Sequence, residues 1–144
     1  MNKNAQKWIN ALKSSKFKKS KGQLHYEENG KHYYCCLGVA CELYQKETHS
    51  DSSLPKLLIQ KFSINEKGIS KIKFYNYDGC SGYLPEKVVN WLGLKDCSGT
   101  FNNTSLIKLN DTDDDPDIGN PEPDFSFKEI ANIIENNANL FKEV

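Results

Sequence analysis

The sequence predicts an α+β fold, in which a small antiparallel sheet packs against four to five short helices. Asn29-Gly30 separates two aromatic-rich runs, residues 23–27 and 31–35. Asn-Gly between such runs is the strongest short signal for a β-hairpin, because both residues tolerate positive φ. Several other segments repeat apolar residues at helical spacing, and these predict the helices.

The N-terminal segment is expected to form an amphipathic helix at residues 4–14 that buries one apolar face. The lysine-rich stretch 14–22 that follows is expected to be a loop. The apolar face of this first helix holds Ala5, Trp8, Ile9 and Leu12.

After the hairpin, residues 36–46 are expected to form a second helix. Its buried face includes Cys36, whereas Cys41 is expected nearer the opposite face. Residues 54–62 are expected to form a short helical turn.

Residues 68–77 alternate apolar and polar side chains, which predicts a further strand of the sheet, near 69–77. The next helix is expected to have Pro85 in its first turn and Gly93 as its C-terminal cap. After a polar loop at residues 96–103, a short helical segment is expected at 105–110.

The last helix has the clearest start signal in the chain. Ser126 and Glu129 match a capping box, and Phe125 with Ile130 matches the hydrophobic staple that often accompanies it. We therefore expect a helix that begins at this point and packs an apolar face on the core.

The chain length of 144 residues fits one domain, residues 1–144, with a core that needs no disulfide or metal. No apolar run is long enough to span a bilayer, and the N-terminus has no signal-peptide core, so we expect no membrane contact and a cytoplasmic location. Five cysteines, an odd number, agree with a reducing compartment.

The net charge is zero, but its distribution along the chain is uneven. Residues 1–22 carry lysines and no acidic residue, while residues 110–124 carry acidic residues and no basic one. These segments either attract each other or a partner, or are solvated stretches that merely neutralise each other. All basic residues other than histidine are lysines, and the absence of arginine argues against sequence-specific nucleic-acid recognition.

No cysteine has a recognisable partner for catalysis or metal binding. Cys35 and Cys36 are adjacent, which is poor geometry for one tetrahedral metal, and no CxxC pair occurs. Small buried thiols are the alternative to a zinc site. His25 and His32 are expected to approach each other across the hairpin, which indicates cross-strand packing as readily as a site.

The acidic segment 111–124 contains carboxylates at the spacing of a calcium-binding EF-hand loop. Pro116 stands where that loop requires glycine, so a solvated acidic loop is the alternative. No other cofactor is expected. The candidate calcium ligands are Asp111, Asp113, Asp115, Asp117 and Glu122.

Aromatic residues concentrate on the predicted sheet and its edges. Much of this is expected to be core packing. The alternative is a pocket that stacks a planar ring and holds an anion, although no P-loop or GxGxxG loop is present. The candidate ligand-binding residues are Lys21, Tyr34, Tyr77, Tyr83 and Asn110.

Five segments of the chain form a recognisable pattern: residues 21–24, 34–44, 83–94, 106–111 and 126–131. In this order, they resemble a family of small uncharacterised phage and prophage proteins. The resemblance implies no enzymatic activity, and it makes 111–124 an insertion, because the family joins the flanking elements by a short turn.

The resemblance implies a setting in the cytoplasm of an infected bacterial cell, where small phage proteins act against host defences. The leading hypothesis is a non-catalytic, homo-oligomeric binding protein that sequesters a nucleotide-derived immune signal. In it the tyrosines stack, Lys21 meets phosphate and Asn110 reads a ring edge or ribose. One alternative is a protein-binding inhibitor of a host defence protein, and another is a hydrolase of such a signal.

Overall fold

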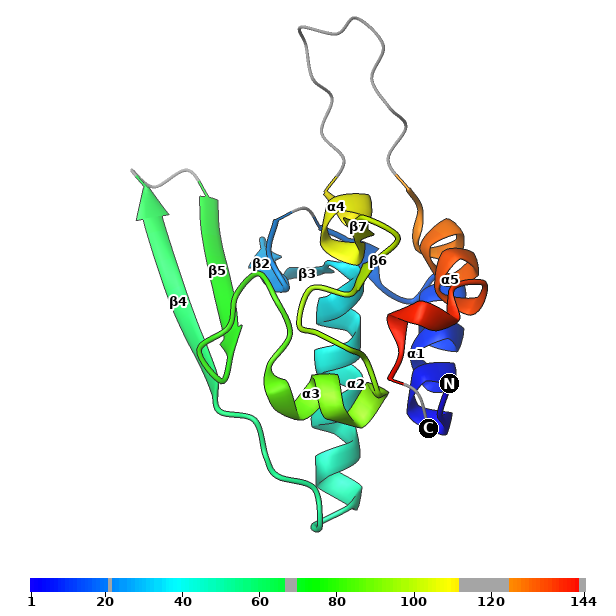
Figure 1. The fold of residues 1–144 in the computed structure, drawn as a ribbon. Coiled ribbons are helices and arrows are strands. Elements are labelled where there is room, and N and C mark those ends of the chain that lie inside the picture. Colours follow the sequence, from blue (N-terminus) through cyan, green and yellow to red (C-terminus); the bar gives the residue numbers. More distant parts are fainter. Residues whose placement is uncertain (21, 67–69, 112–124, 143–144) are drawn as a thin grey trace, which may run out of the picture.

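Five strands form one mixed sheet, and helices pack against one of its faces (Figure 1). The computed structural model describes residues 1–20, 22–66, 70–111 and 125–142, and it confirms the predicted α+β class. In chain order the elements are α1 (Lys3–Lys13), β1 (Lys18–Lys19), β2 (His25–Glu28), β3 (Lys31–Tyr34), α2 (Cys36–Ser50), β4 (Ile59–Glu66), β5 (Ser70–Tyr77), α3 (Glu86–Leu92), β6 (Thr100–Phe101), β7 (Thr104–Ser105), α4 (Leu106–Asn110), α5 (Phe127–Glu135) and the 3-10 helix η1 (Ala138–Leu140).

The strand order of the main sheet is β1-β3-β2-β5-β4. The hairpin β2–β3 turns at Asn29 (φ 53°) and Gly30 (φ 81°), which confirms the Asn-Gly prediction. The sheet is not wholly antiparallel, because β1 pairs parallel with β3. A strand of two lysines inside a lysine-rich stretch has no alternation that could reveal it, so the sequence predicted only a loop there.

The predicted helical turn at residues 54–62 is wrong. Strand β4 begins at Ile59 and pairs with β5 along its whole length, from Ile59 opposite Tyr77 to Glu66 opposite Ser70. Apolar residues of β4 fall on both faces of the sheet, which hides the period-two pattern of a strand. The long-range pairing with β5 therefore decides the conformation, and the local sequence does not.

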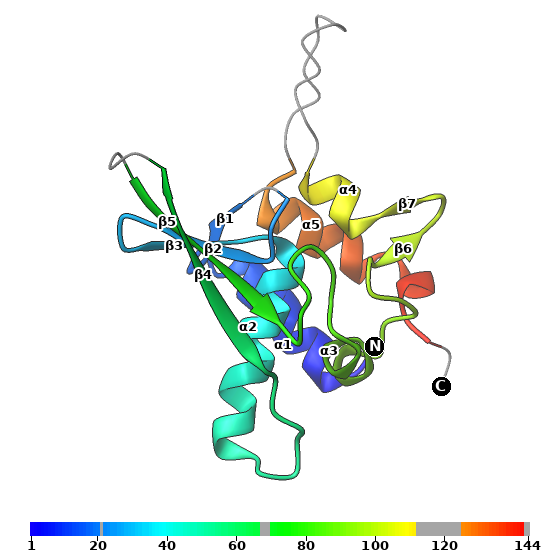
Figure 2. The same cartoon turned by 90° about the vertical axis from the view of Figure 1, so that its left-hand side faces the viewer.

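Helix α2 lies between the sheet and the helix pair α1–α5 (Figures 1 and 2). It continues to Ser50, beyond the predicted end. Because it is enclosed on several sides, both Cys36 and Cys41 are fully buried, so the face of the helix on which Cys41 was expected is covered as well. No helix among the described residues has the length and apolar character needed to cross a membrane.

Two helix caps predicted from the sequence are confirmed, and a third cap was not predicted. The third is Asn2, whose side chain accepts a hydrogen bond from the Ala5 N–H (2.8 Å) at the start of α1. Gly93 ends α3 in the left-handed conformation, at φ 77°. Ser126 and Glu129 form the capping box at the start of α5.

One close approach between backbones positions α2 on the sheet. Gly38, in the first turn of α2, lies against Leu24 just before β2, and an added Cβ would stand 1.7 Å from the Leu24 carbonyl oxygen. At the same end of α2, the Trp8 Nε1–H donates a hydrogen bond to the Cys36 carbonyl (2.8 Å). Only glycine at position 38 permits this packing.

We expect Gly38→Ala to destabilise the protein by about 3 kcal/mol or more, because the methyl group meets rigid backbone. Gly82→Ala is the matched control, since its Cβ would meet the nearest atom at an ordinary 3.7 Å. Urea unfolding of both variants measures the difference. Equal stability of the two variants would contradict this account of α2 packing.

Candidate functional site

Two of the predicted ligand-binding residues, Tyr34 and Tyr77, meet on the covered face of the sheet. Both are buried, Tyr77 to 1% exposure. Both contact His25: its ring stacks on Tyr34, with ring centroids 4.2 Å apart, and its Nδ1 is 2.9 Å from the Tyr77 hydroxyl. Tyr75 stacks on His25 as well, at 4.0 Å. These tyrosines pack around a histidine instead of lining an open pocket.

His25 is part of a hydrogen-bonded chain that ends near the surface. Its Nε2 is 2.7 Å from Nδ1 of His32, and Nε2 of His32 is 3.3 Å from a carboxylate oxygen of Glu27. Since a carboxylate only accepts, His32 carries its hydrogen on Nε2 and accepts from His25 at Nδ1. His25 Nδ1 then accepts from the Tyr77 hydroxyl. One set of tautomers therefore gives a partner to the Tyr77 hydroxyl and to all four ring nitrogens of His25 and His32.

These hydrogen bonds leave neither histidine with a free ring nitrogen. Burial, and then the neighbouring His32, lowers the pKa of His25 to about 4, while Glu27 acts in the opposite direction. Asp78, which follows Tyr77 in the chain, has other partners. It accepts from the Leu58 N–H (2.6 Å) and pairs with Lys87 (3.0 Å). The two histidines do meet across the hairpin, and their ring nitrogens bond to other groups of the protein.

The core cysteines are protonated thiols. Burial raises the pKa of the Cys35 thiol to about 12, and it also holds the pKa of Cys36 and of Cys41 well above the usual range. Cys35 instead caps α2, where its sulfur accepts from the Gly38 N–H at 3.3 Å. A buried neutral thiol is a poor nucleophile, so these residues serve packing.

Asn110 holds three segments together at the start of α2. Its side-chain oxygen accepts from the Cys36 N–H (3.1 Å), and its amide nitrogen donates to the Ser20 carbonyl (2.8 Å) and to Asp111 (2.9 Å). Asp111 in turn accepts from the Gly22 N–H (2.8 Å). Both ends of this amide are occupied and the residue is 1% exposed, so the predicted ligand-reading role of Asn110 is replaced by a structural one.

The other predicted site residues do not join this arrangement. Tyr83 is half exposed. Lys21 and four of the candidate calcium ligands lie outside the described residues, so calcium binding stays a prediction. Among the residues that the structure describes, no three His, Cys, Asp or Glu side chains are grouped to hold a metal. The four ligands in question are Asp113, Asp115, Asp117 and Glu122.

The opposite, open face of the sheet carries an aromatic row that crosses all five strands. Lys18 of β1 is opposite Tyr33 of β3, and Tyr33 is opposite Tyr26 of β2. Tyr26 is opposite Phe74 of β5, and Phe74 is opposite Phe62 of β4. Directly paired residues share a face. We call these five side chains the aromatic row.

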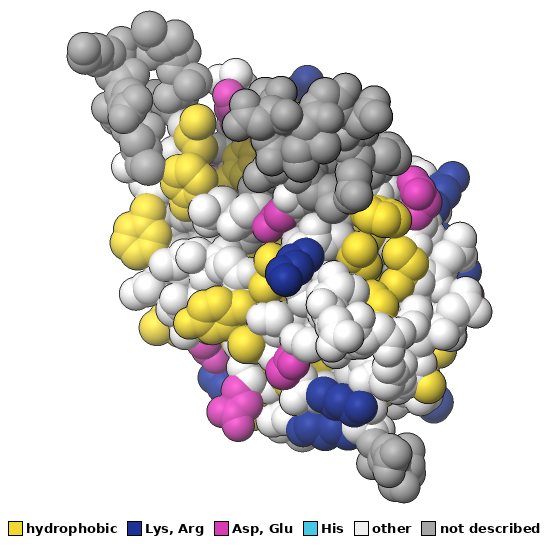
Figure 3. Space-filling view, turned by 45° about the horizontal axis from the view of Figure 1, so that its top comes forward, with side chains coloured by type: hydrophobic (Ala, Val, Ile, Leu, Met, Phe, Trp, Pro, Cys, Tyr) yellow, Lys and Arg dark blue, Asp and Glu magenta, His cyan; other side chains and the backbone are white. Residues whose placement is uncertain are grey.

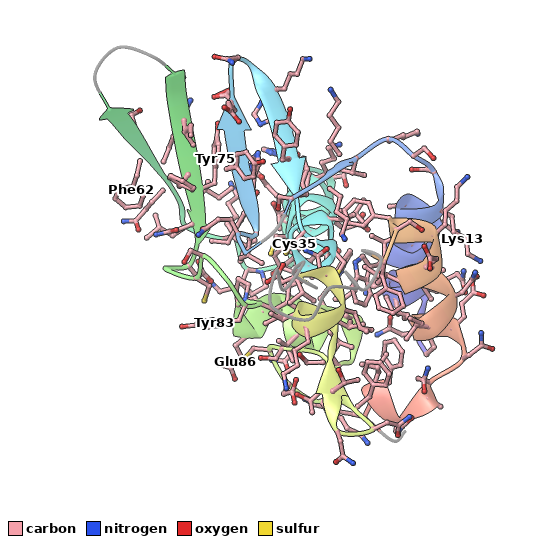
Figure 4. All side chains as sticks on the ribbon, turned by 90° about the horizontal axis from the view of Figure 1, so that it is seen from above. Lys13, Cys35, Phe62, Tyr75, Tyr83 and Glu86 are labelled. Carbon is pink, nitrogen blue, oxygen red and sulfur yellow. The ribbon has the colours of Figure 1, made fainter. Side chains whose placement is uncertain are left out.

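The rings of the aromatic row lie close enough to form one surface. Tyr26 and Tyr33 stack with centroids 4.9 Å apart, and Tyr26 is 6.4 Å from Phe74. The Lys18 ammonium lies 6.0 Å from the centre of the Tyr33 ring. Phe62, at the outer edge of the sheet and far from the helices (Figure 4), is 49% exposed. Hydrophobic side chains reach the surface beside the β4–β5 hairpin (Figure 3).

The sequence placed Tyr26, Tyr33 and Phe74 among the sheet aromatics but could not assign them to a face. The signal was present in the alternation of each strand, since His25 and Glu27 occupy one face of β2 and Tyr26 the other. Their alignment into one row depends on the strand register. Phe62 was missed because its segment was predicted as helical.

Comparison with known proteins shows the family of the chain. Residues 1–138 match the family described as "Domain of unknown function (DUF8296)", so the chain belongs to this family. No curated protein and no solved structure matches the chain.

We expect the stability to fall as the pH drops from about 6.5 to about 4 because of His25. The unfolded chain binds a proton on this residue near pH 6.5, whereas the folded state resists it until about pH 4. This difference destabilises the fold by on the order of 2–3 kcal/mol at the acid end.

Urea unfolding between pH 7 and pH 4.5 measures this dependence. In His25→Gln the slope should flatten, while the exposed control His49→Gln should keep the wild-type slope. An unchanged slope in His25→Gln would contradict the neutral, buried state of this ring.

We expect Asn110→Ala to destabilise the protein by about 2–4 kcal/mol, because the Cys36 N–H and the Ser20 carbonyl lose their partner. Asn132→Ala, at an exposed position of α5, is the control and should change little. Thermal unfolding compares the two variants. If Asn110→Ala is as stable as the wild type, the structural role of Asn110 is contradicted, and Asn110 is again a candidate ligand contact.

Proposed function

We propose that the protein is a non-catalytic binding protein that captures a nucleotide-like ligand on the aromatic row. The observation that carries this proposal is the alignment of four rings and a lysine, one from each strand, on the open face of the sheet. Nucleobases stack on exposed aromatic rings with about 1–3 kcal/mol per base. Such stacking needs no P-loop or Rossmann turn.

The aromatic row has a cationic end and an apolar end, which suits a ligand with both phosphate and ring. Lys18 adjoins Tyr33, and Lys31 lies on the same face of β3, two residues before Tyr33. Both lysines are exposed. Phe74 and Phe62 occupy the other end. Phosphate would meet the lysines while the base stacks on the rings.

Binding without catalysis is supported by the state of the candidate catalytic groups. The ring nitrogens of His25 and His32 are engaged within the fold, and the thiols of Cys35, Cys36 and Cys41 are buried and protonated. A hydrolase of the same ligand would need a base or a nucleophile that these residues do not offer. The hydrolase hypothesis therefore ranks below sequestration.

The resemblance to small phage proteins supplies the biological setting of the proposal. In the cytoplasm of an infected cell, a protein that binds a nucleotide-derived immune signal and holds it intact would silence the defence that depends on it. We propose this role, with a homo-oligomer as the working form. A protein-binding inhibitor remains the second candidate, because Phe62 (49%) and Leu58 (63%) expose apolar surface that another protein could cover.

The proposal predicts that a cyclic dinucleotide or an ADP-ribose derivative binds and raises the melting temperature. Tyr33→Thr and Tyr26→Thr should each weaken binding by about 5- to 100-fold, because a stacking partner is lost while a strand-forming residue remains. Tyr83→Ala, which lies outside the aromatic row, is the control and should bind normally. Calorimetry measures the affinities.

Chromatography of the ligand after the protein is denatured separates sequestration from cleavage, and intact ligand is the expected result. If none of these compounds binds, or if the two Thr variants bind as tightly as wild type, the proposal is wrong. Binding of a host protein that requires Phe62 would favour the second candidate instead.

A further inference from the structure

The two edges of the sheet are built differently. The β1 edge has two residues, Lys18–Lys19, and both are lysines. A short, charged edge strand is a common protection against pairing with another chain. The β4 edge has eight residues, Ile59–Glu66, and its backbone groups on the outer side face no described strand or helix (Figures 1 and 2).

The only lysine within β4 does not protect this edge from pairing with another strand. Lys61 is opposite Tyr75, on the face that the helices cover, and its ammonium lies 5.6 Å from the centre of the Tyr75 ring. On the open face, the neighbouring Phe62 is 49% exposed, and Leu58 just before the strand is 63% exposed. A long edge with exposed apolar side chains is typical of strands that pair with another strand.

We propose that β4 pairs antiparallel with β4 of a second copy of the chain, about a two-fold axis perpendicular to the sheet at Phe62. Such an axis keeps both open faces on one side, so the two sheets become one sheet of ten strands. Phe62 of each copy then lies beside Phe62 of the other. The aromatic rows of both copies join into one continuous row, with Lys18 at each far end.

A second copy fits this edge better than an unrelated strand because the edge is complementary to itself. Pairing centred on Phe62 places Lys61 opposite Ser63 of the second copy, so no lysine meets a lysine across the contact. The two-fold contact is closed, and the outermost strands of the ten-stranded sheet are then the two short β1 strands. Pairing thus removes the unprotected edge and leaves the protected one.

This inference deepens the proposed function and rests on it in one respect only, namely that each aromatic row is a ligand surface. Neighbouring strands lie about 4.8 Å apart, so the two Lys18 ends of the joined row are on the order of 40 Å apart, which is too far for one cyclic dinucleotide to reach both. The dimer therefore presents two ligand surfaces that meet at Phe62, and it predicts one ligand for each chain. The pairing itself does not require any ligand and can be tested without one.

Light scattering coupled to size-exclusion chromatography tests the pairing in the unliganded full chain. The expected mass is that of two chains. Phe62→Lys should halve it, because two ammonium groups would face each other at the axis, whereas Tyr33→Lys, on the same face but three strands away, should remain dimeric. Far-ultraviolet circular dichroism checks that both variants fold.

Hydrogen exchange of the wild-type protein at high and low concentration gives a reading that needs no variant. About half of the backbone N–H groups of β4 point outward, and these should be protected only at high concentration. A monomer at high micromolar concentration, or a dimer that survives Phe62→Lys with β4 unprotected, would overturn the inference. Loss of ligand binding in Tyr33→Lys with an intact dimer would leave the pairing standing and would test the proposed function alone.

Discussion

The close approach of α2 to the backbone of Leu24 at Gly38 is the contact on which the arrangement of this protein depends. It brings the start of the central helix against the sheet, where the Cys36 carbonyl accepts a hydrogen bond from Trp8 and the Cys36 N–H donates one to Asn110. The same contact decides which face of the sheet is covered. His25, Tyr34 and Tyr77 come to lie beneath α2, and the other face remains open to solvent.

The aromatic residues of the sheet therefore perform two separate tasks. On the covered face they enclose two histidines whose ring nitrogens all have partners, which stabilises the interior and limits its chemical reactivity. On the open face they form the aromatic row, whose rings do not enclose a hydrogen-bonded network of this kind. We propose that the second set binds a planar ligand without transforming it, and the engaged nitrogens of the first set are consistent with this proposal.

The features that the sequence predicts correctly all depend on local chemistry. Asn29-Gly30 has the backbone freedom for a tight turn, Ser126 with Glu129 satisfies the first N–H groups of α5, and Gly93 adopts positive φ. The features that the sequence missed depend on distant partners. Strand β4 exists because β5 pairs with it, and Asn110 is occupied because α2 and Ser20 meet it. The aromatic row requires the register of five strands, which no single segment contains.

The central claim is that the open aromatic row, and not the buried tyrosine cluster, is the ligand surface. Nuclear magnetic resonance of the aromatic rings during titration with a cyclic dinucleotide tests it most directly. The account predicts shifts at Tyr33, Tyr26 and Phe74, with little change at Tyr77. Shifts confined to Tyr34 and Tyr77 would show that the ligand enters the covered face, and they would contradict it.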